Sequence, residues 1–221
     1  LIIFLLGFMS DMVKSFLPIV RLLIQAFICL VFLIYFKLSI TDVRIDIVNN
    51  LLNFSFVTYL FTLFCVLVLM NGSNFMDGVN LLSIGYFLMV LTSVLWVSEN
   101  FQVEINLPLV KNLFLILSFL FLMNLFNKVF LGDNGIYLLS FIIAVILIKF
   151  YNDNEYISPY YVICLLWYPC FENLFSIIRK KTENINPQKA DNLHLHHLLY
   201  KKLANIKSAQ MRNNLTGFSI L

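Results

Sequence analysis

Long runs of apolar residues, separated by short polar segments, dominate the chain. Six runs are near the roughly 17–25 residues that a helix needs to cross a bilayer. They lie at residues 18–36, 51–70, 81–97, 107–126, 135–151 and 158–178. Because lipid offers no partner to backbone amides and carbonyls, each run is predicted to be a helix.

Shorter apolar runs stand at both ends, at residues 1–9 and 215–221. Neither could cross a bilayer alone, and the chain begins with Leu1 rather than Met. We therefore expect a fragment of a longer protein, cut inside two further spans. The predicted fold is all-α, a polytopic integral membrane helix bundle forming one domain over residues 1–221, with about six full and two partial transmembrane helices.

The composition agrees with a membrane protein. Hydrophobic residues make up 61% of the chain and charged residues 12%, with a mean hydropathy of +0.88. Soluble domains have about 25% charged residues, so a soluble globular protein is unlikely on this basis, as are disordered and fibrous chains. The net charge of +3 is too small to indicate a nucleic-acid partner. The four cysteines lie in apolar runs without metal-ligand or redox spacing, so no disulfide framework is predicted.

The basic residues fall mostly on one side of the predicted membrane. Alternation of the spans places loops 10–17, 71–80, 127–134 and 179–212 on the first side. This side, with its helix ends, holds eleven of the fifteen lysines and arginines. The other side holds Lys37, Arg44, Lys111 and Lys149. The positive-inside rule therefore predicts that the first side faces the cytoplasm.

The most distinctive polar residues also fall on that first side. Asn71, Asn74 and Asp77 recur every three residues after an uncharged run, so a helix would place them on one face. Such a face suits a hydrated Mg²⁺ or a phosphate–sugar ligand, although a polar helix end with a turn at Asp77-Gly78 would give the same pattern. Asp11, after Ser10, is by itself typical of a solvated boundary residue.

A third polar segment runs from Asn124 to Gly135 and contains Asp133 just before an apolar run. Asp133 could cap the following helix, and a cap and a metal ligand are not exclusive. Alone, its Gly-Asp-Asn-Gly sequence is a weak signal.

All three histidines, His194, His196 and His197, lie within four residues, after a basic cluster. They could form a metal site, but binding of a diphosphate beside the basic cluster is the favoured interpretation. Glu172 lies in an apolar run and is either functional, with Arg179 two turns away as a partner, or a charge that reaches out to the membrane surface.

Together these motifs resemble the polyprenyl-phosphate N-acetylhexosamine-1-phosphate transferase family, relatives of the phospho-MurNAc-pentapeptide translocase. The resemblance is carried by Asn71 to Gly78, by Phe-Leu-Gly-Asp ending at Asp133, and by His194 to His197. It implies transfer of a sugar 1-phosphate from a UDP-sugar to undecaprenyl phosphate, with release of UMP. It also implies Mg²⁺, which Mn²⁺ could replace, and a bacterial inner membrane enzyme that starts a cell-envelope glycan. A homodimer is compatible with it.

The resemblance also implies roles for individual residues. Asp11 matches a residue that engages the lipid phosphate, Asp133 matches the Mg²⁺ ligand, and Asp77 matches the nucleotide-sugar cleft with a share in the metal. Substrate binding is implied for Asn71, Asn74, Asn80, Asn124, His194, His196 and His197.

Three positions depart from the family pattern. Ser10 and Asn80 stand where carboxylates are expected, and Asn134-Gly135-Ile136 replaces a common Ala/Ser/Thr-Gly-Ser. Two alternatives to an active enzyme stay open: a homologue that has lost catalysis, and a transporter or flippase. A transporter predicts polar residues near the bilayer midplane and broken helices.

Overall fold

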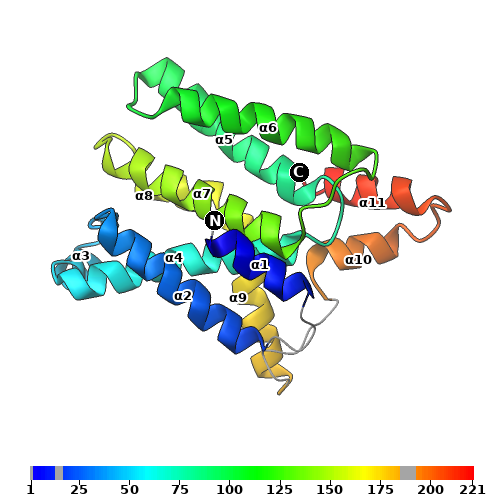
Figure 1. Cartoon of the computed structure of the whole chain (residues 1–221), viewed down its shortest axis with the longest axis horizontal. Helices are drawn as coiled ribbons and strands as arrows, with labels where there is room; N and C mark the ends of the chain where they lie inside the picture. The colour runs from blue at the N-terminus through cyan, green and yellow to red at the C-terminus, as the bar shows by residue number, and fades with distance from the viewer. Residues whose placement is uncertain (1, 13–16, 185–192) are drawn as a thin grey trace.

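The computed structural model describes residues 2–12, 17–184 and 193–221, with the backbone alone at Asp11. Within these ranges every regular element is helical, which confirms the predicted all-α fold (Figure 1). The helices are α1 (Ile2–Met12), α2 (Pro18–Tyr35), α3 (Asp46–Leu52), α4 (Ser55–Met76), α5 (Leu82–Phe101), α6 (Leu107–Leu125), α7 (Gly132–Asn152), α8 (Pro159–Leu165), α9 (Trp167–Thr182), α10 (Leu195–Lys202) and α11 (Ala209–Phe218).

Five of the predicted spans are confirmed as single helices. Among the described residues, α2, α4, α5, α6 and α7 are long and apolar enough to cross a membrane, and α8 with α9 gives a sixth if the pair is one span. The chain is therefore a multi-pass membrane protein. The largest shift in a boundary is at α4, which continues to Met76 instead of ending at residue 70 and so carries the asparagine motif on a helix.

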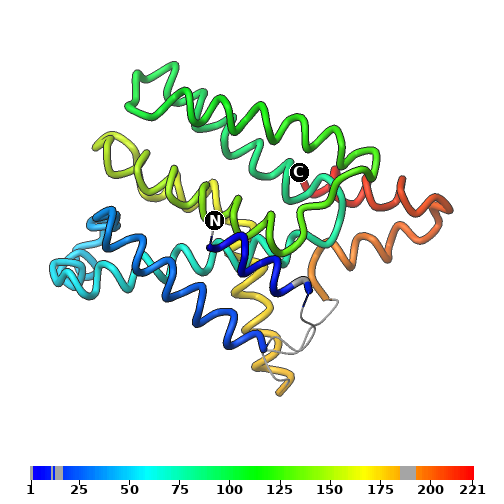
Figure 2. Tube along the Cα trace, in the orientation of Figure 1, coloured from blue at the N-terminus to red at the C-terminus, as the bar shows by residue number. Residues whose placement is uncertain are grey.

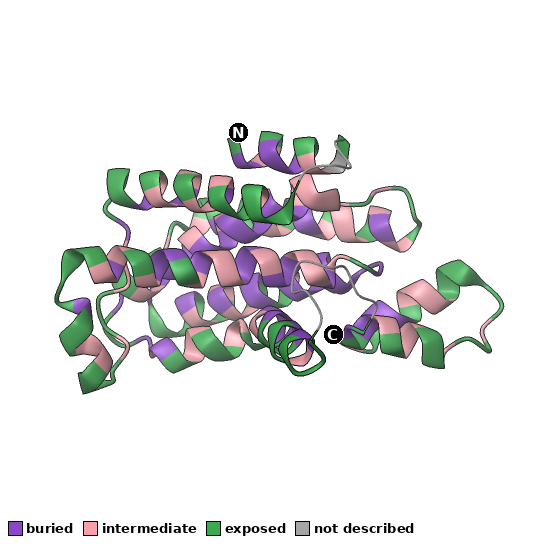
Figure 3. Ribbon diagram, turned by 90° about the horizontal axis from the view of Figure 1, so that it is seen from below, coloured by how far each residue is buried: buried purple, intermediate pink, exposed green. Residues whose placement is uncertain are grey.

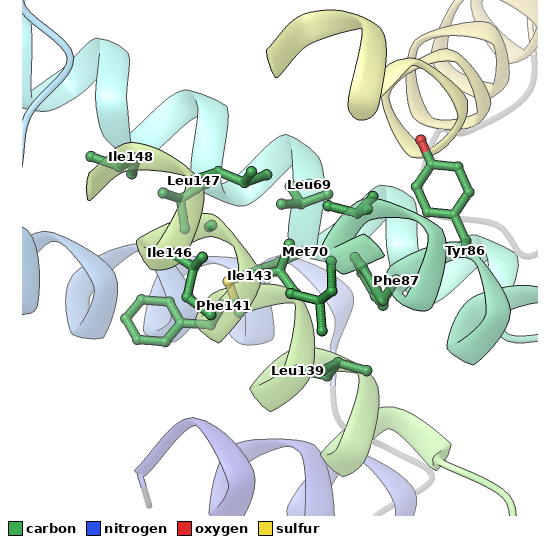
Figure 4. Packing of buried hydrophobic residues seen from close by; sticks show 14 of the residues in the cluster. Leu69, Met70, Tyr86, Phe87, Leu139, Phe141, Ile143, Ile146, Leu147 and Ile148 are labelled. Atoms are coloured by element: carbon green, nitrogen blue, oxygen red, sulfur yellow. The ribbon is translucent and has the colours of Figure 1, made fainter. Parts of the chain in front are cut away.

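The prediction of one continuous helix over residues 158–178 is wrong. The chain bends by 71° between α8 and α9, at Leu166. Pro169 has no N–H, and its ring would clash with the carbonyl of Leu165 in a continuous helix. The hydroxyl of Tyr86 donates to that carbonyl instead, at 2.5 Å, and Figure 4 shows it directed toward the bent pair.

The polar segments also contain short helices that hydropathy did not predict. α3 begins in the predicted loop 37–50 and ends at Leu52, inside the predicted span 51–70, and α10 lies in the predicted loop 179–212. The run expected at residues 215–221 belongs to α11, which begins at Ala209 because the Ser208 hydroxyl caps it by accepting from the backbone N–H of Met211.

The core forms around α4, which packs against α2, α7 and α9, while α5 packs against α6. Figure 4 shows Leu69 and Met70 of α4 facing Ile143 and Leu147 of α7. Buried positions lie between the helices and exposed positions follow their outer faces (Figure 3), as a lipid-facing surface requires.

The loops gather at two ends of the bundle, as the alternation of spans predicts. In Figure 2 the turns 77–81 and 126–131, with α10 and α11, lie at the right-hand end. Loops 36–45, 102–106 and 153–158 lie at the left-hand end. α1 packs closely on the start of α7. Gly7 permits this approach, because a Cβ there would clash with the backbone of Asn134. We call the first end, where the motifs lie, the motif end.

Candidate active site

A cleft of about 680 Å³ opens at the motif end. It lies between the start of α2, the ends of α4 and α9, and α10. Its polar lining residues are Arg21, Asn71, Asn74, Asp77, Asn173, Lys180, His194, His196 and His197. Motifs that are far apart in the sequence therefore converge on one cavity with several basic side chains.

The face predicted for Asn71, Asn74 and Asp77 is confirmed, since all three line the cleft. Asn71 is held by its own helix, because its side-chain N–H₂ donates to the carbonyl of Leu67 at 2.9 Å. Asp77 is the C-cap residue of α4 and accepts a hydrogen bond of 2.5 Å from the Ser83 hydroxyl. The expected turn at Asp77-Gly78 is present, and it directs the chain back into α5.

The three histidine rings form one cluster at the start of α10, in which His194 and His196 are stacked and His197 is tilted against both. The ring centroids of His194 and His196 are 5.8 Å apart, and those of His196 and His197 are 4.1 Å apart. His194 also stacks on Phe75 of α4, with centroids 4.9 Å apart. The histidine segment is thus packed directly against the helix that carries Asp77.

Glu172 contacts this histidine segment, so the suggested pairing with Arg179 is wrong. One carboxylate oxygen lies 2.8 Å from Nδ1 of His194, and the other accepts from the backbone N–H of Leu195 at 3.0 Å. Arg179 instead donates to the carbonyl of Leu193 at 3.1 Å.

His196 is fully buried, and in the part of the chain that the structure describes neither ring nitrogen has a hydrogen-bond partner. Gly78 makes this position possible, because a Cβ there would lie 2.4 Å from Nε2 of His196. Burial, reinforced by His197 and His194, lowers the pKa of His196 to about 4. His196 is therefore neutral near pH 7 and offers a hydrogen bond to a ligand rather than a positive charge.

Asp133 lies beside the cleft, at the contact between α1, α2 and α7. Its Oδ2 accepts from Nη1 of Arg21 at 2.9 Å and from the Ser10 hydroxyl at 2.7 Å. Nη1 of Arg21 also donates to the Ser10 oxygen at 2.9 Å. The interpretation of Asp133 as a helix cap is wrong, because α7 begins at Gly132 and its N-cap residue is Leu131. Asp11 follows Ser10 in α1, and its side chain lies outside the described residues.

Asn80 and Asn124 lie outside the cleft, in a cluster that joins the 77–81 turn to α6 and α11. The side-chain N–H₂ of Asn80 donates to Asn127 and, at 2.9 Å, to Asn214. The side-chain oxygen of Asn124 accepts from the backbone N–H of Leu81 at 2.6 Å. Their predicted role in substrate binding stays a prediction, whereas their hydrogen bonds stabilise the turn that follows Asp77.

Sequence reasoning did not select three of the lining residues: Arg21, Asn173 and Lys180. Arg21 lies in the first turn of a membrane span, where an arginine is itself unusual, and this position could have indicated a functional role. Lys180 is only 5% exposed although it lies in the middle of a basic cluster, and the helical period of α9 would have placed it with Asn173 and Glu172.

The cleft offers oxygen ligands for a hydrated Mg²⁺. Asp77, Asn71 and Asn74 line it, and Mg²⁺ usually takes one or two carboxylates together with water and substrate phosphates. Among the described residues no three His, Cys, Asp or Glu side chains are grouped as a metal site. Asp77 lines the cleft, whereas Asp133 lies beside it in an ion pair with Arg21, and the predicted metal-binding role of both residues stays a prediction.

An apolar pocket of about 270 Å³ adjoins the cleft inside the bundle. It lies between α4, α7, α8 and α9, and Phe64 and Val68 line both cavities. A polar cavity at the end of the bundle thus lies next to an apolar one between the membrane helices.

The fold and the cleft together define a multi-pass membrane protein with a basic, polar cavity at one end of its bundle. Comparison with known proteins gives the family: the sequence profile of glycosyl transferase family 4 matches residues 1–151, and the chain belongs to this family. A similar protein is the undecaprenyl-phosphate alpha-N-acetylglucosaminyl 1-phosphate transferase of Thermotoga maritima. It is 29% identical over 94 residues, which are 42% of this chain and 30% of that protein's length.

Proposed function

We propose that the protein transfers a sugar 1-phosphate, of the N-acetylhexosamine type, from a UDP-sugar to undecaprenyl phosphate and releases UMP. The product would start a lipid-linked glycan of the bacterial cell envelope. The reaction would occur at the cytoplasmic face of the inner membrane, where the positive-inside rule puts the motif end.

The observation that carries this proposal is that the two cavities lie next to each other. The polar cleft suits the diphosphate of a nucleotide sugar, and the apolar pocket that shares Phe64 and Val68 suits the chain of a lipid acceptor. An enzyme that joins a water-soluble donor to a membrane lipid needs a polar and an apolar environment side by side, so that the two phosphates can meet.

The chemistry requires no strong base. An oxyanion of the lipid phosphate attacks the phosphorus that bears the sugar, a new P–O bond forms, and the bond to the bridging oxygen breaks so that UMP leaves. Mg²⁺ held by Asp77 would neutralise charge on the donor diphosphate. Arg21 of α2 and Lys180 of α9 both line the cleft and supply positive charge, and so would bind and orient the phosphates.

The test is release of UMP by the purified full-length protein in nanodiscs that contain undecaprenyl phosphate. A panel of UDP-sugars and a Mg²⁺ or Mn²⁺ titration would identify the donor and the cation. UMP release that requires the lipid acceptor, with a matching lipid-linked sugar product, is the expected result. Absence of both with every donor would contradict the proposal and favour the homologue without catalysis or the transporter.

A further inference from the structure

Glu172 occupies an unusual position for a carboxylate. It is 2% exposed and lies on α9, directly after the bend at Leu166, among membrane helices. A buried carboxylate in such a place is costly unless its oxygens are hydrogen-bonded. Both oxygens are engaged, and both partners belong to the histidine segment.

Each of the two contacts performs a different task. The bond from Leu195 satisfies the first N–H of α10, a helix whose own N-cap residue, His194, makes no side-chain cap. The contact with Nδ1 of His194 fixes the hydrogen on that nitrogen, because a carboxylate can only accept. Nε2 of a neutral His194 is then the acceptor of the ring.

Glu172 and Phe75 together leave the imidazole of His194 little freedom. The ring stacks on Phe75 with an angle of 23° between the planes, and Glu172 holds its Nδ1 atom from α9. His194 lines the cleft, so an imidazole with a fixed plane and a fixed tautomer faces the ligand. A neutral imidazole held in this way has its acceptor at Nε2, to which a hydroxyl group of the ligand can donate.

We propose that Glu172 is a positioning residue that fixes the orientation and tautomer of His194 and so prepares that imidazole to accept a hydrogen bond from the ligand bound in the cleft. The role in turnover rests on the proposed transferase function, whereas the effect on His194 does not. The contact with Glu172 distinguishes His194 from His196, whose ring nitrogens have no hydrogen-bond partner among the described residues.

The test is Glu172→Gln, which keeps the shape and the acceptor for Leu195. Its amide would donate to Nδ1 of His194 and so favour the tautomer with hydrogen on Nε2. The measurement is ¹⁵N-histidine labelling of the full-length protein, purified with a tag that lacks histidine, and the spectrum of His194→Gln assigns the ring signals of His194. We expect hydrogen on Nδ1 of His194 in the wild type and loss of that signal in the variant.

Turnover provides the second measurement. We expect Glu172→Gln to lower UMP release by roughly 10- to 100-fold, as misplacing a group that contacts the ligand does. The double variant with His194→Gln should be no slower than the slower single variant, because Glu172 acts through His194. Glu99→Gln is the matched control, since Glu99 pairs with Lys111 at 3.0 Å in an exposed position, and its turnover should equal that of the wild type.

The outcomes separate the two proposals. A wild-type His194 without hydrogen on Nδ1, multiplying effects in the double variant, or unchanged turnover in Glu172→Gln would each overturn the positioning role. If the wild type released no UMP with any donor, the proposed function would fail, and the His194 signals alone would decide whether Glu172 fixes that ring. If Glu172→Gln did not fold, the wild-type spectrum would still decide it.

Discussion

The two ends of the helix bundle use similar polar residues in opposite ways. At the end away from the motifs, polar side chains bind backbone groups of neighbouring loops. Nη2 of Arg44 donates to the carbonyls of Glu155 and Ile157, and Asn154 both donates to and accepts from the backbone of Glu104. These contacts close the loops against one another.

At the motif end, Arg21 binds one oxygen of Asp133 and the Ser10 hydroxyl, and its side chain also lines a cavity. Both contacts use Nη1, and in the part of the chain that the structure describes Nε and Nη2 of Arg21 make no hydrogen bond. An arginine that is anchored by one nitrogen can offer the others to an anion. The residue types are similar at the two ends, and the difference lies in whether the side chain binds backbone groups or lines a cavity.

The largest expected effect comes from Asp77→Asn. The change keeps the size of the side chain and an acceptor for Ser83, but removes the negative charge from the cleft. Turnover should fall about 100-fold or more, as when an electrostatic contribution of roughly 3 kcal/mol is lost. Asp42→Asn at the opposite end is the control, because Asp42 accepts from the backbone N–H of Arg44 and should leave UMP release unchanged. Equal losses of turnover in Asp77→Asn and Asp42→Asn would contradict the proposed difference between the two ends of the bundle.

Replacing the two arginines tests the contrast directly. Arg21→Gln removes a positive charge from the cleft and the counter-ion of Asp133, so turnover should fall roughly 10- to 100-fold. Arg44→Gln should keep turnover and lower the free energy of unfolding by about 1 kcal/mol, because hydrogen bonds to two carbonyls are weakened. The measurements are UMP release and chemical unfolding, and a loss of turnover in Arg44→Gln alone would reverse the assignment of the ends.

The stability of the motif end should depend on pH through His196. Its pKa is about 4 in the folded protein and near 6.5 when unfolded, so the unfolded chain binds the proton more readily between these values. The full stability is present above pH 6.5 and is lost as the pH falls toward 4. At pH 5 the expected loss is about 2 kcal/mol. Unfolding at pH 7.5 and pH 5 would show it, and His196→Gln should remove this part of the difference.

The smallest effect is expected at Asn80, where an aspartate would match the family pattern. Asn80 is 2% exposed and donates to the side-chain oxygens of Asn127 and Asn214. Asn214 cannot turn its amide without losing its own bond to the carbonyl of Leu125. Asn80→Asp should therefore lower the free energy of unfolding by about 1–2 kcal/mol and change turnover only modestly. Asn74→Asp, inside the cleft, should instead change turnover more than stability, and the opposite result would place Asn80 in the site.

Much of this architecture was predictable from hydropathy. Lipid offers no hydrogen-bond partner to backbone groups, so the five long apolar runs are helices that cross the membrane in alternating directions. The fixed period of a helix then places Asn71, Asn74 and Asp77 on one face. The bend between α8 and α9 was foreseeable in principle from Pro169, but the apolar run across it gave no sign of a break. The short helices α3 and α10 were missed because a length of seven or eight residues leaves too little periodicity to detect.

The sequence by itself determined which residues lie at the motif end, because each span reverses the direction of the chain and the apolar runs fix the spans. Only the tertiary structure decided which of those residues share the cleft and which partners they have. Glu172 binds His194 instead of Arg179, Asp133 binds Arg21 instead of capping α7, and Asn80 lies under α11. Hydropathy specifies the depth and the side of each helix but not its rotation or its neighbours, and it is the packing of α1, α2 and α7, and of α9 with α4, that sets these pairs.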